Sequence, residues 1–249
     1  MTRKVTLSDA EQGSQEWHNL RCGILTASLV KHIITPKKKE VSVTFHETVF
    51  FKKKVLERVT GMIIDHIDDE GAYQSEAMIE GASDEDWAIK NYSEHYEEDV
   101  SRTGFIHLSD ENYQIGFSPD GICENYFIEC KSRAPHLHIQ TVLTSKVPDE
   151  FMAQIQTGLL VTGFEYAKYV SWPRVSESFS EHFSLPAMCI RVERDEEYIA
   201  NIEKAAIAFE EKIKEESQRL LQILANRREN FFPAKKEYVS EILGSEVLS

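Results

Sequence analysis

The sequence predicts an α/β fold with a central mixed β-sheet flanked by helices. Short strand-like runs separated by turn residues fill the middle of the chain, and segments with helical periodicity lie on either side of them. Residues 126–172 form a strand–helix–strand passage that is long enough for a crossover connection. No repeat or Gly/Ser linker divides the chain. We therefore expect a single domain over residues 1–249, with its core at about 11–230 and a C-terminal tail over 231–249.

The first half of the chain has helical patterns. Thr26 or Ser28 can cap a short helix through Ile34, which Pro36 ends. Longer helices are predicted over residues 44–59, ended by a glycine, and over residues 73–96.

Strand-like runs begin after Gly104. Turn sequences separate them, and connections this short predict a meander of residues 105–108, 113–117 and 126–132. The predicted elements that follow are a helix over 149–162, strands over 165–172 and 187–192, and a long amphipathic helix over 196–227.

The composition excludes several classes of protein. The chain has no apolar run of the roughly 18 residues that a membrane span needs, and its N-terminus lacks the apolar stretch of a secretory signal. Its four cysteines are scattered without C-x-x-C spacing, which argues against a zinc or iron–sulfur site and suits reduced thiols. We expect a cytoplasmic protein with no membrane partner.

The charge is unevenly distributed. The net charge is −14, which at first argues against a polyanionic partner. Residues 31–60, however, contain 8 Lys or Arg and 3 Asp or Glu, a balance of +5, whereas residues 61–100 contain 13 acids and one lysine, a balance of −12. Such segregation can place a basic stripe on an acidic protein, or it can reflect two solvated helix faces. Charge alone leaves both interpretations open.

The segments Ser118-Pro119-Asp120-Gly121 and Ile128-Glu129-Cys130-Lys131 carry the clearest chemistry. Alternate residues of a strand share a face, so Glu129 and Lys131 point the same way. A hairpin return can bring Asp120 beside Glu129, and two carboxylates with a lysine suit Mg²⁺-assisted phosphodiester hydrolysis. The alternative is a surface ion pair on an edge strand.

Two helices offer further candidates. Glu85 lies on a small or apolar helical stripe, where an unpaired carboxylate is expensive to bury, so it must pair, bind metal or be wrongly assigned to this stripe. Gln154 lies beside the core stripe of the helix over residues 149–162. It is either a satisfied residue at the edge of the core or an amide that holds a water or a phosphate oxygen.

The segment 16–28 suggests a phosphate site. Arg21 and the hydroxyls of Thr26 and Ser28 lie near a predicted helix N-terminus, which offers free N–H groups and a positive dipole. A plain helix cap with a surface salt bridge at Arg21 explains the same residues.

Taken together, five ordered motifs resemble the lambda exonuclease (YqaJ-type viral recombinase) family of the PD-(D/E)xK nuclease superfamily. They are EWHNLRCGILTAS at 16–28, EGASDE at 80–85, GFSPDG at 116–121, IECKS at 128–132 and FMAQIQTGLLVTG at 151–163. The similarity covers most of residues 11 to about 230. It implies a restriction-endonuclease-like core.

The resemblance also implies roles for individual residues. Asp120, Glu129 and the backbone carbonyl of Cys130 would bind Mg²⁺, and Glu85 would hold a second ion directly or through water; Mn²⁺ can substitute. Lys131 and Gln154 would position or activate the attacking water. The pocket for a 5′-phosphate would consist of Arg21, Ser28 and Ser118.

The implied activity is digestion of one strand of linear duplex DNA from its 5′ end, leaving 3′ overhangs for single-strand-annealing recombination. The implied partners are double-stranded DNA ends, a single-strand annealing protein and two further copies in a homotrimeric ring, in a bacterial cytoplasm and of phage or prophage origin. A ring would reconcile the charges, with basic residues lining the channel. Two alternatives stay open: a related endonuclease of restriction or repair type, and a catalytically silent protein that binds DNA ends.

Two departures from the family pattern stand near the site. Phe151 occupies a position where relatives often carry a tyrosine, so any role of that hydroxyl is absent here. The sequence Cys130-Lys131-Ser132-Arg133 replaces the commoner Lys-Cys-Pro ending, which affects the strand exit more than the metal ligands.

Overall fold

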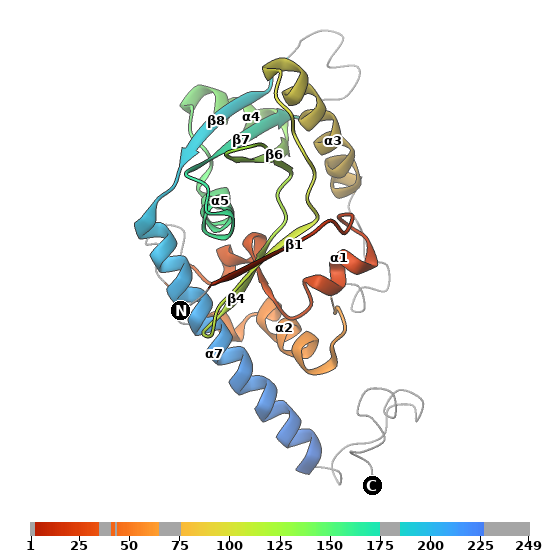
Figure 1. The fold of residues 1–249 in the computed structure, drawn as a ribbon, viewed down its shortest axis with the longest axis vertical. Coiled ribbons are helices and arrows are strands. Elements are labelled where there is room, and N and C mark those ends of the chain that lie inside the picture. Colours follow the sequence, from red (N-terminus) through yellow and green to blue (C-terminus); the bar gives the residue numbers. More distant parts are fainter. Residues whose placement is uncertain (1–2, 35–40, 43, 65–75, 175–184, 227–249) are drawn as a thin grey trace.

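A computed structural model describes residues 3–34, 41–42, 44–64, 76–174 and 185–226, with only the backbone described over 76–84. Two four-stranded sheets make up its centre, one of order β1-β3-β4-β2 and one of order β5-β6-β7-β8 (Figure 1). The first sheet consists of β1 (Lys4–Ser8), β2 (Leu25–Thr26), β3 (Phe105–Ser109) and β4 (Gln114–Phe117). The second consists of β5 (Gly121–Ile122), β6 (Phe127–Arg133), β7 (Tyr166–Pro173) and β8 (Met188–Glu193).

Both sheets are mixed. In the first, β1, β3 and β4 are antiparallel neighbours, and β2 runs parallel to β4. In the second, β6 and β7 are parallel, and β5 and β8 are their antiparallel neighbours. The chain crosses from β6 to β7 through α4 (Pro135–Thr144) and α5 (Asp149–Thr162), so the predicted crossover is confirmed, as is the mixed α/β class.

The predicted three-strand meander is wrong. Its first two strands pair as β3 and β4, but the third, β6, lies in the other sheet. The segment Ser118-Pro119-Asp120 carries the chain between the sheets. Pro119 has no N–H to donate to a ladder, which favours the end of β4 at Phe117.

The predicted helices are present: those predicted from residues 149 and 196 start there, whereas the one predicted from residue 44 starts at Val49. They are η1 (Ala27–His32), α2 (Val49–Thr60) after the short η2 (Phe45–Glu47), α3 (Glu76–Tyr96), α5 and α7 (Glu196–Asn226). Two glycines with positive φ, Gly61 at 69° and Gly163 at 75°, end α2 and α5 as expected of left-handed C-caps. The helix after Thr26 is a six-residue 3-10 helix, and Thr26 makes no side-chain capping bond. The sequence did not reveal α1 (Gln15–Leu20), which Ser14 caps through a bond to Trp17 N.

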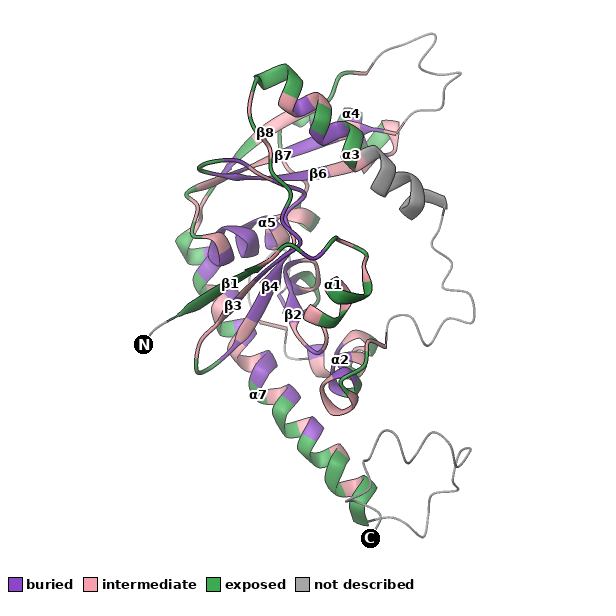
Figure 2. Cartoon of the chain, turned by 45° about the vertical axis from the view of Figure 1, so that its right-hand side comes forward, coloured by how far each residue is buried: buried purple, intermediate pink, exposed green. Residues whose placement is uncertain are grey.

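The core joins the two sheets through α5. This helix lies between them (Figure 1) and packs against β3, β4 and β7. A Cβ on Gly158 of α5 would stand 2.5 Å from Phe127 Cζ and 2.8 Å from Phe117 Cζ, so only glycine permits this approach. The long α7 packs against α2 and α5. Its buried side chains form a stripe along one side (Figure 2), which includes Ile202, Phe209 and Ile213.

A second cluster of buried residues lies between α3 and the β6–β7 face. Ala88, Ile89 and Tyr92 of α3 pack there with Ile128 and Cys130. No helix in the described ranges combines the length and apolar character that crossing a membrane requires.

Candidate active site

The hairpin β5–β6 brings the first two predicted site residues together. Gly121 of β5 pairs with Ile128 of β6, so Asp120 lies beside the Glu129–Cys130 segment. The peptide N–H of Cys130 donates to Asp120 Oδ2 at 2.6 Å, which fixes the carboxylate against the strand. The backbone of Cys130 therefore lies at the site, and the role of its carbonyl as a ligand stays a prediction.

The alternation along β6 is the predicted one. Ile128 and Cys130 are buried against α3, while Glu129 and Lys131 share the opposite face. The Nζ of Lys131 contacts Glu129 Oε1 and lies 3.9 Å from Asp120 Oδ2. Glu129 is fully buried and Asp120 almost so. This is a buried charge cluster and not the surface ion pair of the alternative interpretation.

Helix α5 supplies Gln154. Its Nε2 donates to Glu129 Oε1 at 2.6 Å, so the amide contacts the same carboxylate oxygen as Lys131. The two donors hold Glu129 in one orientation. This places Gln154 within the site and not merely at the edge of the core.

Glu85 reaches the cluster from α3, together with a residue that the sequence did not reveal. Arg102 Nη1 donates to Glu85 Oε1 at 3.0 Å, and its Nη2 contacts Asp86. Arg102 is brought there by an antiparallel bridge between Ser101 and Ile122 of β5. The only signal in the sequence is a single arginine that follows an acidic segment.

Burial raises the pKa values of all three acids, and the charge of Asp120 adds to the shifts of Glu129 and Glu85. Burial, followed by the charge of Asp120, raises the pKa of Glu129 to about 8 and that of Glu85 to about 7, although Arg102 opposes the latter shift. Burial also raises the pKa of Asp120, against the lowering effect of Lys131. Burial disfavours the charged Lys131, but Glu129 and Asp120 outweigh it and raise its pKa. Additional positive charge nearby would therefore favour the deprotonated forms of these acids.

The donor set fits a divalent cation of the hard, oxygen-binding type. Glu129 Oε2 is buried and has no hydrogen-bond partner within the described part of the chain. Two nearby carboxylates suit Mg²⁺, which is commonly bound by one or two carboxylates and keeps several waters. Over the described residues no group of three or more His, Cys, Asp and Glu side chains is arranged to hold a metal. Asp120 and Glu129 therefore fit an open site that water would complete.

The predicted phosphate residues lie directly after α1 (Arg21), on η1 (Ser28) and directly after β4 (Ser118). The guanidinium of Arg21 stacks on the ring of Trp17, 3.8 Å from its centroid. Trp17 Nε1 in turn donates to Ser118 Oγ at 2.9 Å, so Trp17 links Arg21 to Ser118. Ser28 Oγ lies 3.3 Å from Thr26 Oγ1, and the pairing of Thr26 with Gly116 brings the start of η1 alongside the end of β4. Side chains, and not a long helix N-terminus, therefore define this candidate pocket.

The family follows from a match over more than half of the chain. Residues 16–165 match the family model of the YqaJ-like viral recombinase domain. The chain belongs to the YqaJ-like viral recombinase family. All the predicted catalytic, metal and phosphate residues fall within the matched range: Arg21, Ser28, Glu85, Ser118, Asp120, Glu129, Cys130, Lys131 and Gln154.

Solved structures of exonucleases resemble this YqaJ-like chain over most of its length. An alkaline exonuclease from Laribacter hongkongensis, LHK-Exo, is 27% identical with a TM-score of 0.67, covering 85% of this chain and 98% of its own. Its complex with dAMP gives 28% identity, the same TM-score and the same coverage. A phage related exonuclease from Haemophilus somnus 129PT shares the fold at 14% identity, with a TM-score of 0.57 and coverages of 83% and 99%. Among curated proteins none matches. The restriction-endonuclease-like fold is thus confirmed.

Proposed function

We propose that this chain is a magnesium-dependent DNA exonuclease that digests one strand of linear duplex DNA from a 5′-phosphorylated end. Its family and the alkaline exonuclease that it resembles support the coarser part, a DNA exonuclease. The complex of that enzyme with dAMP fits a product that is a nucleoside monophosphate. The observation that carries the proposal in this chain is the buried cluster of Asp120, Glu129 and Lys131, in which Glu129 Oε2 lacks a partner.

Each residue of the cluster has a role in phosphodiester hydrolysis. Asp120 and Glu129 would hold Mg²⁺, which when bound polarises the phosphoryl oxygen and acidifies a water. Lys131 offsets the negative charge of the scissile phosphate and orients the attacking water, since its Nζ lies beside both carboxylates. Gln154 keeps Glu129 in the orientation that leaves Oε2 open.

A second ion is proposed at Glu85. Its carboxyl interacts electrostatically with Asp120, and Arg102 holds its Oε1. Glu85 would reach such an ion directly or through water, with Arg102 moving aside or binding a phosphate oxygen. Mn²⁺ satisfies the same oxygen ligands and is expected to substitute.

The direction of digestion is assigned to the pocket of Arg21, Ser28 and Ser118. An arginine and two hydroxyls recognise a terminal phosphate through charge-assisted hydrogen bonds. A 5′-phosphate bound there would leave the adjacent phosphodiester for hydrolysis at the cluster and would yield a 3′ overhang. The homotrimeric ring, the annealing partner and the bacterial cytoplasm belong to the same proposal and rest on family resemblance.

One digestion experiment tests the proposal. Linear duplexes with 5′-phosphate or 5′-hydroxyl ends are incubated with the protein in Mg²⁺ or EDTA, beside a covalently closed circular duplex. We expect rapid digestion only of the phosphorylated linear duplex in Mg²⁺. Cleavage of the closed circle would indicate the endonuclease alternative, and binding of ends without digestion would indicate the silent protein.

A further inference from the structure

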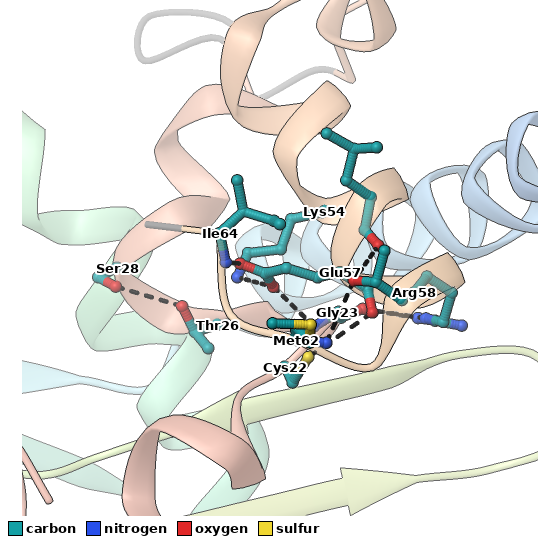
Figure 3. Close-up of polar contacts among 11 residues, drawn as sticks. Cys22, Gly23, Thr26, Ser28, Lys54, Glu57, Arg58, Met62 and Ile64 are labelled. Atoms are coloured by element: carbon teal, nitrogen blue, oxygen red, sulfur yellow. Dashed lines mark hydrogen bonds and ion pairs between the residues drawn. The ribbon is translucent and has the colours of Figure 1, made fainter. Parts of the chain in front are cut away.

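The turn between α1 and β2 is fixed through one residue, Gly23, because the peptide units on both sides of it are bound by α2. Gly23 is buried and has a φ of +66°. Its N–H donates to Glu57 Oε2 at 2.7 Å, and its carbonyl accepts from Arg58 Nη2 at 2.8 Å and Nε at 3.2 Å. Both polar groups of Gly23 are therefore bound by two consecutive residues of α2, as Figure 3 shows.

Charged residues surround this contact and tie it to two helices. Lys54 Nζ lies 2.6 Å from Glu57 Oε2, and the side chains of both are almost completely buried. Arg58 also donates from Nη1 and Nη2 to the two carboxylate oxygens of Glu210 on α7, at 2.8 and 3.0 Å. A Cβ on Gly23 would make a tight contact, 3.1 Å from Arg58 Nε, and the positive φ at this position favours glycine independently.

Stability alone does not explain the buried ionic network of Lys54, Glu57, Arg58 and Glu210. Apolar residues of similar volume commonly give equal or greater stability than a buried ion pair, because burying charges carries a large desolvation cost. What apolar residues cannot do is bind an N–H and a carbonyl in defined directions. Glu57 and Arg58 therefore orient the two peptide units that flank Gly23, and Arg58 also binds α2 to α7.

Gly23 is the junction between the two halves of the candidate phosphate pocket. Arg21 stands two residues before it, and Ile24 N donates back to Arg21 O at 3.2 Å to close the turn. After it, Leu25 and Thr26 pair with β4 and lead to Ser28. The backbone conformation at Gly23 therefore sets how the chain leads from Arg21 to Ser28.

We propose that Glu57 and Arg58 are positioning residues that hold Arg21 and Ser28 in register and thereby set the preference of the enzyme for a 5′-phosphate over a 5′-hydroxyl end. This inference rests on the proposed function, since it assigns the origin of specificity within the same pocket. Neither residue takes part in the hydrolysis, because both bind the back of the turn and not the Asp120–Glu129–Lys131 cluster.

The test is the ratio of kcat/KM on linear duplexes with 5′-phosphate and 5′-hydroxyl ends at saturating Mg²⁺. Arg58→Lys keeps a positive charge near Glu210 but loses the paired donation to the Gly23 carbonyl. We expect the ratio to fall about tenfold or more, as for loss of a hydrogen bond to a charged group. KM for the phosphorylated end should rise while kcat changes little. Gly23→Ala is expected to act in the same way.

Two reference variants make the result decisive. Tyr113→Phe removes another bond to α7, from Tyr113 Oη to Glu203 Oε1 at 2.8 Å, without touching the turn, and should leave the ratio unchanged. Arg21→Ala should abolish the preference. If the wild-type protein digests both kinds of end equally, the proposed 5′-phosphate pocket itself is wrong. That result differs from a failure of the positioning role of Glu57 and Arg58 alone.

Three outcomes would overturn the inference itself. In the first, the wild-type protein prefers 5′-phosphate ends and Arg21→Ala loses this preference, but Arg58→Lys and Gly23→Ala fold and keep it. The second is an equal loss on both kinds of end, which marks a purely structural role. The third is failure of both variants to fold, since the contact would then serve folding and not positioning.

Discussion

The affinity of the site for Mg²⁺ is expected to rise steeply with pH. Glu129 is fully buried and faces Asp120 on the hairpin, Lys131 on its own strand, Gln154 on α5 and the charge of Glu85 on α3. Burial, followed by the charge of Asp120, raises its pKa to about 8. Below that pH an incoming ion must displace a proton from Glu129, and above it the carboxylate is already charged.

The size of the effect follows from the pKa of Glu129. One competing proton with a pKa of about 8 weakens ion binding by a factor of about 100 at pH 6 and about 1.1 at pH 9. The difference is about 90-fold, or about 2.7 kcal/mol of binding free energy. Folding of the metal-free protein has the opposite dependence, because the pKa of Glu129 is above its ordinary 4.5: its contribution to stability is full below about pH 4.5 and is lost as the pH rises through about 8.

Calorimetric titration of Mg²⁺ into the metal-free protein between pH 6 and 9 measures this directly, with thermal unfolding as the second readout. Glu129→Gln should remove the transition near pH 8. A matched control is Glu98→Gln, which alters a partly exposed carboxyl beside Lys168, outside the site, and should leave the transition in place. An Mg²⁺ affinity that does not vary with pH in the wild-type protein would refute the reasoning, as would an unchanged pH dependence in Glu129→Gln.

Further predictions follow from single contacts. Lys131→Met should lower the digestion rate about 100-fold or more with an unchanged circular-dichroism spectrum. Gln154→Leu leaves Glu129 without one charge-assisted bond and should lower kcat about ten- to 100-fold. Gly158→Ala introduces a Cβ 2.5 Å from Phe127 Cζ and should lower the free energy of unfolding by about 1–3 kcal/mol in denaturant titrations. Size-exclusion chromatography with light scattering should give the mass of a trimer, and a monomer mass would contradict the proposed ring.

Elements with a strong local signal could be predicted from the sequence. The helix α5 matches its predicted bounds of 149–162, because an apolar helical stripe precedes a glycine that can adopt a left-handed conformation. The parallel pair β6–β7 follows from the length of the intervening passage. The fold class needed only these elements and the helices around them.

Short or exposed strands escaped prediction for a physical reason. Four of the five residues of β1 are exposed and the fifth is partly so, and the strand is held by backbone pairing with β3, about 100 residues away in the sequence. A strand that buries little leaves no apolar alternation to detect. The strands β2 and β5 have two residues each, too few for any pattern. Without β5, the division of the strands into two sheets could not be foreseen.

In the candidate site, too, local relations could be predicted from the sequence and tertiary contacts could not. The relation of Glu129 to Lys131 is local, because alternation along one strand determines it. Arg102 is positioned by a bridge between Ser101 and Ile122, and no sequence pattern predicts that bridge. Likewise, the contact of Arg58 with Gly23 joins residues 35 positions apart, and the one with Glu210 joins residues 152 positions apart. Tertiary packing alone creates these contacts.

Because the candidate site is divided in this way, we expect that proposed hydrolysis and proposed recognition of the 5′-phosphate can be perturbed separately. The hydrolytic half, from Asp120 to Gln154, is built on one hairpin and one packed helix, and its groups bind each other directly. The half that would recognise the 5′-phosphate depends on a turn whose orientation is set by α2 and α7. Perturbing those helices should therefore alter which ends are digested before it alters the rate of hydrolysis. The groups proposed for recognition and for hydrolysis share no residue, and the segment Ser118-Pro119-Asp120 connects them between the two sheets.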